Sequence, residues 1–326
     1  MKKLLYFFVL FLSVSLIMYG CAQDGESASS ESEYPSEEME LTIAFGPGGG
    51  NDLMARTLVD IIEQHELYPE SIVPENKDGG SGAVGWGYVA NQKEDPYHMS
   101  TTSGSFITTP LQSEPGWTYE DFTPIALMAT DDPILVVNDD SEYETLDEII
   151  EAAKTEELVI GGVGVANTPR MITETLKEEE GLNLEYVPFN EEGQLLSGLT
   201  SENLDVILSF PNGVLGQLES GDMRAIAYTG EERLSDFPDI PTFIEEGIEI
   251  TFPMPRGLIL PGDVDEDVRE WWIDTMKEVA ETDEWSKYIE ENHLTEKQLY
   301  GDDFSEYLSD TSEEFKNILD EIDVSD

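Results

Sequence analysis

The chain has 326 residues, of which 71 are Asp or Glu and only 16 are Lys or Arg, giving a formal net charge of −55. Such a polyanion has no basic face for nucleic acid or for anionic lipid, so both are excluded as partners of its surface. With 39% hydrophobic residues the chain can build a core, but a single cysteine excludes a disulfide framework and a cysteine-based metal centre. Because the acid is spread along the whole chain, we expect a halophile-like acidic surface that is stabilised by salt.

The first twenty residues have the pattern of a secretory signal. Lys2 and Lys3 precede an apolar run over 4–18, which is shorter than the ~20 residues of a spanning helix. The only cysteine, Cys21, follows directly and resembles the lipidated residue of a bacterial lipoprotein, although an ordinary signal with an incidental cysteine is the alternative. Residues 21–40 are rich in Ser and Glu and predict a flexible acidic tether. We therefore expect an exported chain, anchored only by lipid at the outer face of the cytoplasmic membrane.

From residue 41 onward, short apolar strands alternate with amphipathic helices, which predicts an α/β fold. The first helix is expected to carry Met54, Leu58, Ile61, Ile62 and His65 on one face. A capping box at Thr145, an N-cap at Thr168 and a C-terminal Gly181 mark later helices. Strands are expected at 41–45, 72–75, 98–102, 158–161, 184–187, 205–210, 224–228 and 256–260, with a second series beginning near Ile134 and helices through 271–288 and 304–322.

Two series of strands and helices followed by a helical tail predict two lobes. We expect lobe 1 to comprise 41–132 and 256–326, and lobe 2 to comprise 133–255, with a ligand cleft between them.

A glycine-rich loop joins a strand to a helix in each predicted lobe. The two loops contain Gly48, Gly49, Gly50 and Asn51 in lobe 1, and Gly162, Gly164, Val165, Asn167 and Thr168 in lobe 2. Glycine lets the backbone approach a ligand closely, and the free N–H groups of a helix N-terminus favour an anion. Either loop alone is compatible with a simple tight turn and cap. Together they predict two anion-binding turns that face each other, with Asp52 assigned to helix capping.

The few arginines are informative in so acidic a chain. Arg256 is interpreted as a cleft residue that makes a carboxylate contact, and Arg170 is a second candidate. Arg56 is interpreted mainly as a structural partner. For each of them a surface ion pair with a neighbouring acid is the alternative.

Signatures of enzymes, cofactors and metals are weak. Gly80 to Gly85 match G-x-G-x-x-G, but the next strand ends in Thr101-Thr102-Ser103 without the acidic residue of a dinucleotide site, so no cofactor is expected. Asp263, Asp265 and Asp267 have the first spacings of an EF-hand loop, but Val268 replaces its glycine and an acidic helix start is favoured. Because G-x-S-x-G, H-E-x-x-H and Walker motifs are absent from the sequence, we expect no catalytic and no metal-binding residues.

Distinctive blocks of sequence follow one another in order from Leu41 to about Pro261: Phe45-Gly46-Pro47-Gly48-Gly49 with Asp52, Ala55 and Arg56; Glu75-Asn76-Lys77 with Gly79 to Gly82; Asp121 to Ile125; Val187-Pro188-Phe189; Arg224 to Ala227; Arg233; Pro238 to Thr242; and Glu246-Gly247. These blocks resemble the extracytoplasmic solute receptors of tripartite tricarboxylate transporters, also called the Bug family. The chain departs from the family pattern at Gly162, Ala166, Asn167 and Arg170 of the second loop, and at Pro255 beside Arg256.

The resemblance implies a two-lobed periplasmic-binding-protein fold of type II, closing on a small carboxylate. It implies delivery to a permease with a large and a small integral-membrane subunit, and we expect the receptor itself to be a monomer. Beyond the two glycine loops, further ligand contacts would come from Ser81, Thr102, Ser103, Ser105, Ser209 and Asn212.

The predicted function is therefore capture of a small organic di- or tricarboxylate, without catalysis. A sensing protein that passes its closed form to a membrane signalling partner is the first alternative, and a secreted hydrolase is the second. Aromatic acids, amino acids and nicotinate-like compounds remain open as ligands.

Overall fold

The computed structural model describes residues 34–321 apart from 166, 190, 235 and 236. The predicted signal, Cys21 and most of the predicted tether lie outside the described residues. The chain divides into two units, 1–36 and 37–326, and the fold reported below is that of the second unit. The predicted tether boundary at residue 40 is wrong, because the first strand, β1, already begins at Met39, whose apolar side chain is fully buried.

The first sheet has six strands within the described residues, in the order β11-β4-β10-β3-β1-β2. β1 is parallel to β2 and β3, whereas β10 is antiparallel to β3 and β4, and β11 is antiparallel to β4. The strands are β1 (Met39–Ile43), β2 (Ile72–Asn76), β3 (His98–Thr101), β4 (Phe122–Asp131), β10 (Met254–Pro261) and β11 (Thr295–Tyr300).

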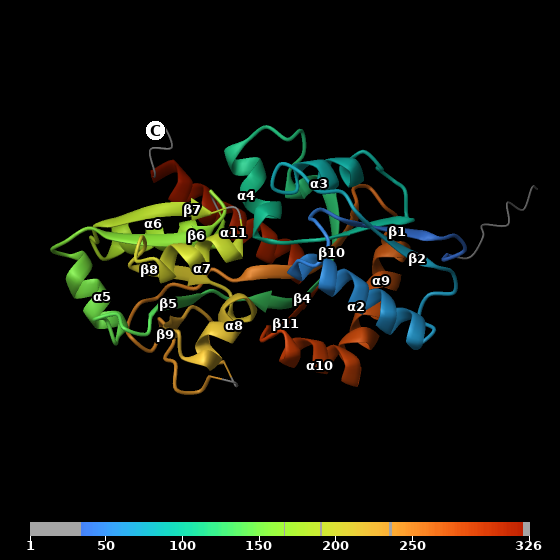
Figure 1. Cartoon of the computed structure of the whole chain (residues 1–326). Helices are drawn as coiled ribbons and strands as arrows, with labels where there is room; N and C mark the ends of the chain where they lie inside the picture. The colour runs from blue at the N-terminus through green and yellow to red at the C-terminus, as the bar shows by residue number, and fades with distance from the viewer. Residues whose placement is uncertain (1–33, 166, 190, 235–236, 322–326) are drawn as a thin grey trace, which may run out of the picture. The chain divides into compact units, whose positions relative to one another are not determined.

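The second sheet has five strands in the described part of the chain, in the order β7-β6-β8-β5-β9. β6 is parallel to β7 and β8, and β5 is antiparallel to β8 and β9. The strands are β5 (Ile134–Asn138), β6 (Leu158–Val163), β7 (Leu184–Phe189), β8 (Val206–Ser209) and β9 (Met223–Tyr228). In Figure 1 this sheet lies toward the left, and β1 and β2 of the first sheet lie toward the right.

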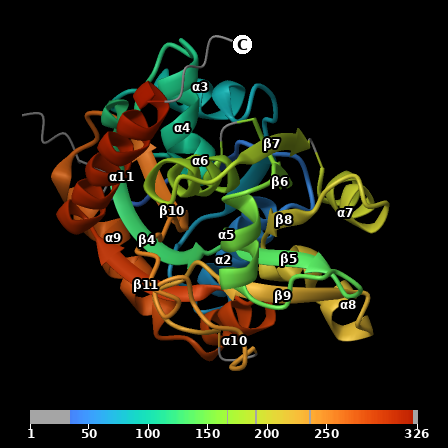
Figure 2. The ribbon, with the colours of Figure 1, turned by 90° about the vertical axis from the view of Figure 1, so that its left-hand side faces the viewer.

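Helices follow the parallel strands in both halves, as the alternating pattern predicts. They are α2 (Gly50–Gln64), α3 (Ala83–Ala90), α4 (Gly104–Gln112), α5 (Leu146–Ala153), α6 (Thr168–Glu179), α7 (Glu192–Thr200), α8 (Pro211–Ser220), α9 (Glu266–Ala280), α10 (Asp283–Glu291) and α11 (Asp302–Glu321), with a 3-10 turn at Tyr119–Asp121. The long α11 packs against both α4 and α6, which Figure 2 shows side by side. The last helix therefore contacts a helix associated with each sheet.

Three local expectations need correction. His65 was expected on one helix face with Met54, Leu58, Ile61 and Ile62, but it follows the last residue of α2 and is exposed, 3.3 Å from Glu284. The N-cap of α6 is Asn167 rather than Thr168, since the Asn167 side chain accepts a hydrogen bond from the Thr168 amide at 2.9 Å. The helix α2 begins at Gly50, inside the segment expected to be a loop.

The chain passes from the first sheet to the second within two residues, Asp132 and Pro133, and returns between β9 and β10. Asp132 is buried, and its Oδ2 accepts hydrogen bonds from the hydroxyls of Thr130 at 3.2 Å, Tyr228 at 3.1 Å and Thr295 at 2.6 Å. These residues lie on β4, β9 and β11, so one carboxylate oxygen links both sheets at the crossing. The first sheet change coincides with the predicted lobe boundary at 132/133, whereas the predicted boundary at 255/256 falls inside β10, which begins at Met254. The lobe boundaries themselves stay a prediction.

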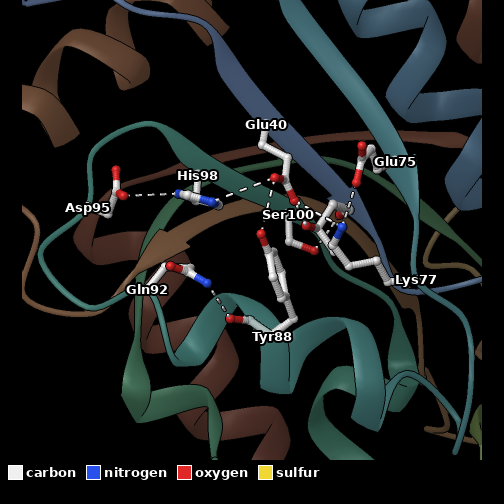
Figure 3. A network of polar contacts seen from close by, with 9 residues as sticks. Glu40, Glu75, Lys77, Tyr88, Gln92, Asp95, His98 and Ser100 are labelled. Carbon is white, nitrogen blue, oxygen red and sulfur yellow. Dashed lines mark hydrogen bonds and ion pairs between the residues drawn. The ribbon is translucent and has the colours of Figure 1, made fainter.

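A polar network braces the outer strands of the first sheet. The Glu40 carboxylate lies between the Lys77 amine at 3.1 Å and the His98 ring at 3.7 Å, and accepts a hydrogen bond from the Tyr88 hydroxyl at 3.1 Å (Figure 3). Lys77 also lies over the Tyr88 ring, 4.3 Å from its centroid. The network therefore joins β1, the segment after β2, β3 and α3, and it contacts β1 and β3 near their amino ends.

Aromatic side chains fill the space between this sheet and its helices. Trp86 contacts Phe106 and Trp117 with centroid distances of 5.2 Å and 5.6 Å, and Phe106 contacts Phe122 at 5.1 Å. All are buried, and Trp86 also donates a hydrogen bond to the Thr101 carbonyl at 2.9 Å. This cluster holds α3 and α4 against β3 and β4.

No helix among the described residues combines the length and apolar character that crossing a membrane requires.

Candidate functional site

The candidate site is built at the carboxyl ends of the parallel strands. In the first sheet β1 and β3 lead into α2 and α4, and in the second sheet β6, β7 and β8 lead into α6, α7 and α8. Ligands of open α/β sheets bind outside these strand ends, where helix N-termini present unpaired N–H groups. Nearly all of the predicted ligand-binding residues lie in these connections or in the first turns of the helices.

The first glycine loop is held in place by Asp52. Its Oδ2 accepts a hydrogen bond from the Gly48 amide at 2.9 Å, and its Oδ1 accepts bonds from Arg56 Nε and Asn76 Nδ2, both at 2.9 Å. The Arg56 hydrogen bond, opposed by burial, lowers the pKa of Asp52 to about 2. Asp52 therefore closes the loop from the first turn of α2, whose N-cap Gly49 has no side-chain cap, and Arg56 is its structural partner, as expected for Arg56.

Arg256 lies beside this loop but is not a free cation. Its guanidinium forms an ion pair with Asp131, and only 6% and 1% of the two side chains are exposed. A Cβ atom on Gly50 would lie 2.6 Å from Arg256 Nη2, so the absent side chain lets the guanidinium reach the first residue of α2. Arg256 Nε and Asp131 Oδ1 are buried without a hydrogen-bond partner among the described residues. Burial raises the pKa of Asp131, and the Arg256 charge opposes this increase.

The first turns of α4 and α6 meet. A Cβ atom on Gly104 would lie 2.7 Å from Asn167 Oδ1 and 3.2 Å from Thr168 Oγ1. Ser103 Oγ, at the N-cap of α4, and Thr168 Oγ1 are both buried and lack a hydrogen-bond partner in the described part of the chain. Two hydroxyl groups without protein partners therefore belong to helix N-termini that contact each other, one from each predicted lobe.

The second glycine loop is shaped by packing. A Cβ atom on Gly162 would lie 2.6 Å from Pro169 and 2.7 Å from the Tyr186 hydroxyl, and Gly164 has a φ of 96°. The Tyr186 hydroxyl donates to the Gly164 carbonyl at 2.8 Å. Arg170 is 2.6 Å from the buried Glu174 and 5.1 Å from the Tyr186 ring centroid, so its charge is already paired.

The other predicted contacts lie around these turns in different settings. Thr102 Oγ1 accepts a hydrogen bond from the Gly257 amide at 3.0 Å and thereby ties the segment between β3 and α4 to β10. Asn51 Oδ1 is buried without a partner among the residues described. Ser209 donates a hydrogen bond to the Glu192 carboxylate. Exposed or half-buried positions are occupied by Gly48, Gly49, Gly50, Ser81, Ser105, Val165 and Asn212.

The G-x-G-x-x-G segment serves packing. A Cβ atom on Gly85 would lie 2.7 Å from the Ala44 Cα and 2.8 Å from the Lys77 carbonyl oxygen. Gly82 has a φ of 88°, and a Cβ atom there would lie 2.1 Å from the Trp86 ring. These glycines let α3 lie directly against the segment after β1.

Within the described residues, no group of three or more His, Cys, Asp or Glu side chains is arranged to hold a metal ion.

Two residues of the site were not expected from the sequence: Asp131 and Glu192. Glu192 is the first residue of α7, next to Ser209 and to Gly213 of α8. Burial raises the pKa of Glu192, the Ser209 hydrogen bond opposes the increase, and the charge of Asp131 adds to it. Glu192 follows the strand ending at Phe189, and Asp131 ends the apolar strand β4. Both residues therefore lie at or just after the carboxyl end of a strand, which is the position that also located the glycine loops.

Comparisons with known proteins agree with this geometry. Residues 55–324 match the family described as tripartite tricarboxylate transporter family receptor. The chain belongs to this family. Its members are solute-binding receptors, and the resemblance read from the sequence blocks is thereby confirmed.

Individual relatives are distant but match over much of their length. The protein BugT of Bordetella pertussis is 26% identical over 228 residues, which cover 67% of this chain and 68% of BugT. A Cupriavidus necator protein described as UPF0065 protein in gbd 5'region is 22% identical over 293 residues, or 89% of each chain.

Solved structures of receptors show the same fold. A TctC solute binding protein from Polaromonas matches with a TM-score of 0.78 and 23% identity, covering 89% of this chain and 100% of that one. MatC from Rhodopseudomonas palustris with bound malate matches with a TM-score of 0.73 and 17% identity, covering 88% and 100%. The predicted two-lobed periplasmic-binding-protein fold is confirmed.

Proposed function

We propose that this receptor captures a small organic di- or tricarboxylate outside the cytoplasm and delivers it to the two integral-membrane subunits of a tripartite transporter. The body would be tethered by lipid at Cys21. The observation that carries the carboxylate assignment is the contact between the first turns of α4 and α6, where Ser103 Oγ and Thr168 Oγ1 are buried without partners among the described residues. Hydroxyl and backbone N–H donors at helix N-termini bind carboxylate oxygens.

The proposal needs no free arginine. Arg56, Arg170 and Arg256 are paired with Asp52, Glu174 and Asp131, so the anion would be held by backbone dipoles and hydroxyl groups. Receptor neighbours support a carboxylate ligand: MatC was solved with malate, and another Rhodopseudomonas palustris protein, with a TM-score of 0.76 and 20% identity, was solved with adipate.

A thermal-shift screen of organic acids in molar salt tests the proposal. A ligand that binds the folded state raises its melting temperature according to the ratio of ligand concentration to Kd. We expect at least one small carboxylate to raise the melting temperature, and amides or methyl esters of the same acids to leave it unchanged. If no carboxylate in the screen raised it, the proposed function would be wrong.

Substitution of Gly49 locates the binding loop. Gly49 has φ −79° and ψ 167°, which any residue adopts, and a Cβ atom there would meet only the Gly46 carbonyl oxygen at 3.8 Å. Gly49→Leu should therefore fold with a nearly unchanged melting temperature yet lose carboxylate binding by more than about tenfold, because the side chain covers the α2 N-terminus. Gly216→Leu, at an exposed position with no atom within 4 Å of its Cβ, is the matched control. Full affinity in Gly49→Leu would remove this loop from the site.

A further inference from the structure

A cavity of about 300 Å³ lies at the crossing between the two sheets, and none of the proposed ligand-binding residues lines it. Its buried wall contains Thr130 and Asp132, at the carboxyl end of β4. Segments after β9 and before β10, which carry the chain back to the first sheet, also line it. Figures 1 and 2 both show β11 beneath β4 and β9 beneath β5 at this crossing. The cavity therefore touches both connections between the sheets.

Asp132 brings an unsatisfied negative charge to the wall of this cavity. Its side chain is buried, and its Oδ2 accepts all three of the hydroxyl hydrogen bonds that link the strands at the crossing. None of the described residues donates a hydrogen bond to its Oδ1, and the neighbouring cation, Arg256, is paired with Asp131 instead. A buried carboxylate without a cation is costly, so a positively charged donor from outside the chain would stabilise it.

The exposed rim of the cavity is acidic as well. Glu231, Glu232 and Glu296 are exposed there, and Lys297 is the only cation among the described residues that line the cavity. The Lys297 amine is already paired with Glu231 at a distance of 3.2 Å. Four carboxylates and one ammonium group therefore line the cavity, when Asp132 is included, and they leave a formal surplus of three negative charges.

We propose that this cavity binds a short aliphatic diamine, with one ammonium group at Asp132 Oδ1 and the other at the rim, near Glu232 and Glu296. Each ammonium group supplies three N–H donors and one positive charge, which meets the donor missing at Asp132 and reduces the charge surplus. This inference goes beyond the proposed function and does not rest on it, because the carboxylate would bind to other residues.

The remaining wall of the cavity suits such a molecule. The hydroxyls of Thr130 and Thr295, which donate to Asp132, line the cavity and keep lone pairs that can accept N–H bonds. Pro253 and the methyl group of Thr251 offer apolar contacts to the methylene groups between the two amines.

Water and a bare alkali ion are the competing occupants. One water molecule takes up about 30 Å³ of the liquid, so a single water or ion would leave most of the cavity unfilled. Several waters would fill it and could donate to Asp132, but they would leave the charge surplus in place. An uncharged molecule of the same length as the diamine therefore distinguishes a need for charge from a need to fill space.

Isothermal titration calorimetry of the full chain at pH 7 in molar KCl tests the inference with 1,3-diaminopropane, 1,4-diaminobutane and 1,5-diaminopentane. At least one should bind saturably and raise the melting temperature. The monoamine n-butylamine should bind about threefold or more weakly, because it leaves the rim glutamates unpaired, and 1,4-butanediol should not bind. Absence of saturable binding by all three diamines, or equally tight binding of the monoamine or the diol, would overturn the inference. No carboxylate is added, so the result is independent of the proposed function.

A bulky side chain in the cavity distinguishes binding there from binding anywhere on the acidic surface. Thr251→Phe fills the cavity without removing a charge and should abolish saturable diamine binding. Thr155→Phe makes the same change at an exposed position outside the cavity and should keep the wild-type affinity. Wild-type affinity in a folded Thr251→Phe protein would overturn the inference.

Charge variants test the two ends of the diamine separately. The double variant Glu232→Gln, Glu296→Gln should weaken diamine binding by about threefold or more, with the protein still folded because both side chains are exposed. Glu246→Gln, Glu249→Gln removes two exposed charges outside the cavity and is the matched control. Equal affinities of the two double variants would overturn the assignment of the rim. Asp132→Asn should weaken binding by about tenfold or more wherever it folds.

Discussion

Arg256 and Asp131 form an ion pair from which water is almost completely excluded, and the Arg256 guanidinium lies against the Cα of Gly50. The pair joins β10 to β4, which are neighbours in the first sheet, and through Gly50 it reaches the first turn of α2. One interaction thus supports both the sheet and the loop proposed to hold the ligand.

Replacing Gly50 by alanine should disturb this arrangement. The new Cβ atom would lie 2.6 Å from Arg256 Nη2, and the guanidinium cannot retreat without leaving Asp131. We expect a loss of about 1–3 kcal/mol in unfolding free energy, measured by urea denaturation, together with weaker carboxylate binding. Gly49→Ala is the control, because its Cβ has no neighbour closer than 3.8 Å. Equal effects of the two substitutions would contradict the packing argument.

Removing only one partner of the Arg256–Asp131 ion pair should lower the unfolding free energy more than removing both partners. Arg256→Met leaves Asp131 buried without its partner and should cost about 3–5 kcal/mol in unfolding free energy. The double variant Arg256→Met, Asp131→Leu removes both charges and should recover a large part of that loss. A double-mutant cycle in urea measures the coupling. Additive effects of the two single changes would show that the pair contributes no coupling energy.

Protonation of Asp52 at low pH should lower the stability of the fold, because Asp52 then loses the interactions that hold the first glycine loop. The pKa of this carboxyl is about 2 in the folded protein against a reference value of 3.8, so the folded state binds its proton less readily than the unfolded state. The stability contributed by Asp52 is therefore present above about pH 4 and is lost as the pH falls toward 2. Asp52→Asn should be less stable than wild type at pH 7, and the difference should shrink across that window. Urea denaturation of both proteins at each pH isolates Asp52 from the other acids, and a pH-independent difference would contradict the assignment.

Two glycines of α3 should respond very differently to alanine. At Gly85 the added Cβ would lie 2.7 Å from the Ala44 Cα and 2.8 Å from the Lys77 carbonyl oxygen, both in the backbone and unable to yield easily. Gly85→Ala should therefore destabilise the protein by about 1–3 kcal/mol or more. At Gly87 the nearest atoms are 3.5 Å away in the Trp117 ring, so Gly87→Ala should be neutral or stabilising by up to about 1 kcal/mol. Thermal melts of the two variants check the contrast, and a stable Gly85→Ala protein would argue against packing as the role of these glycines.

The sequence was most informative where structure is decided locally. Glycine loops, strand ends and caps depend on neighbouring residues, and the strands near Leu41, Ile72 and Leu158 lie where their apolar runs indicate. The strand β4 was missed because it is buried on both faces and therefore shows no alternation, while β11 alternates too weakly to stand out from a helical tail. The identity of β11 as a strand comes from its pairing with β4.

The electrostatics of the site could not be read in the same way. Arg256 and Asp131 are 125 positions apart, and only the register of β10 against β4 brings them together. The sequence predicted Arg256 as a cleft residue, with a surface ion pair to a neighbouring acid as the alternative, and a buried pair with the distant Asp131 was not foreseen. Glu192 was hidden for the same reason, since its importance depends on Ser209 of a different strand.

Asp131 and Asp132 are consecutive, yet one belongs to the candidate site and the other ties β4, β9 and β11 together where the chain changes sheets. A single peptide unit therefore separates the ion pair beside the first glycine loop from the carboxylate that links both sheets at the crossing. If the ligand binds as proposed, no long relay of residues would be needed for its contacts to reach the crossing.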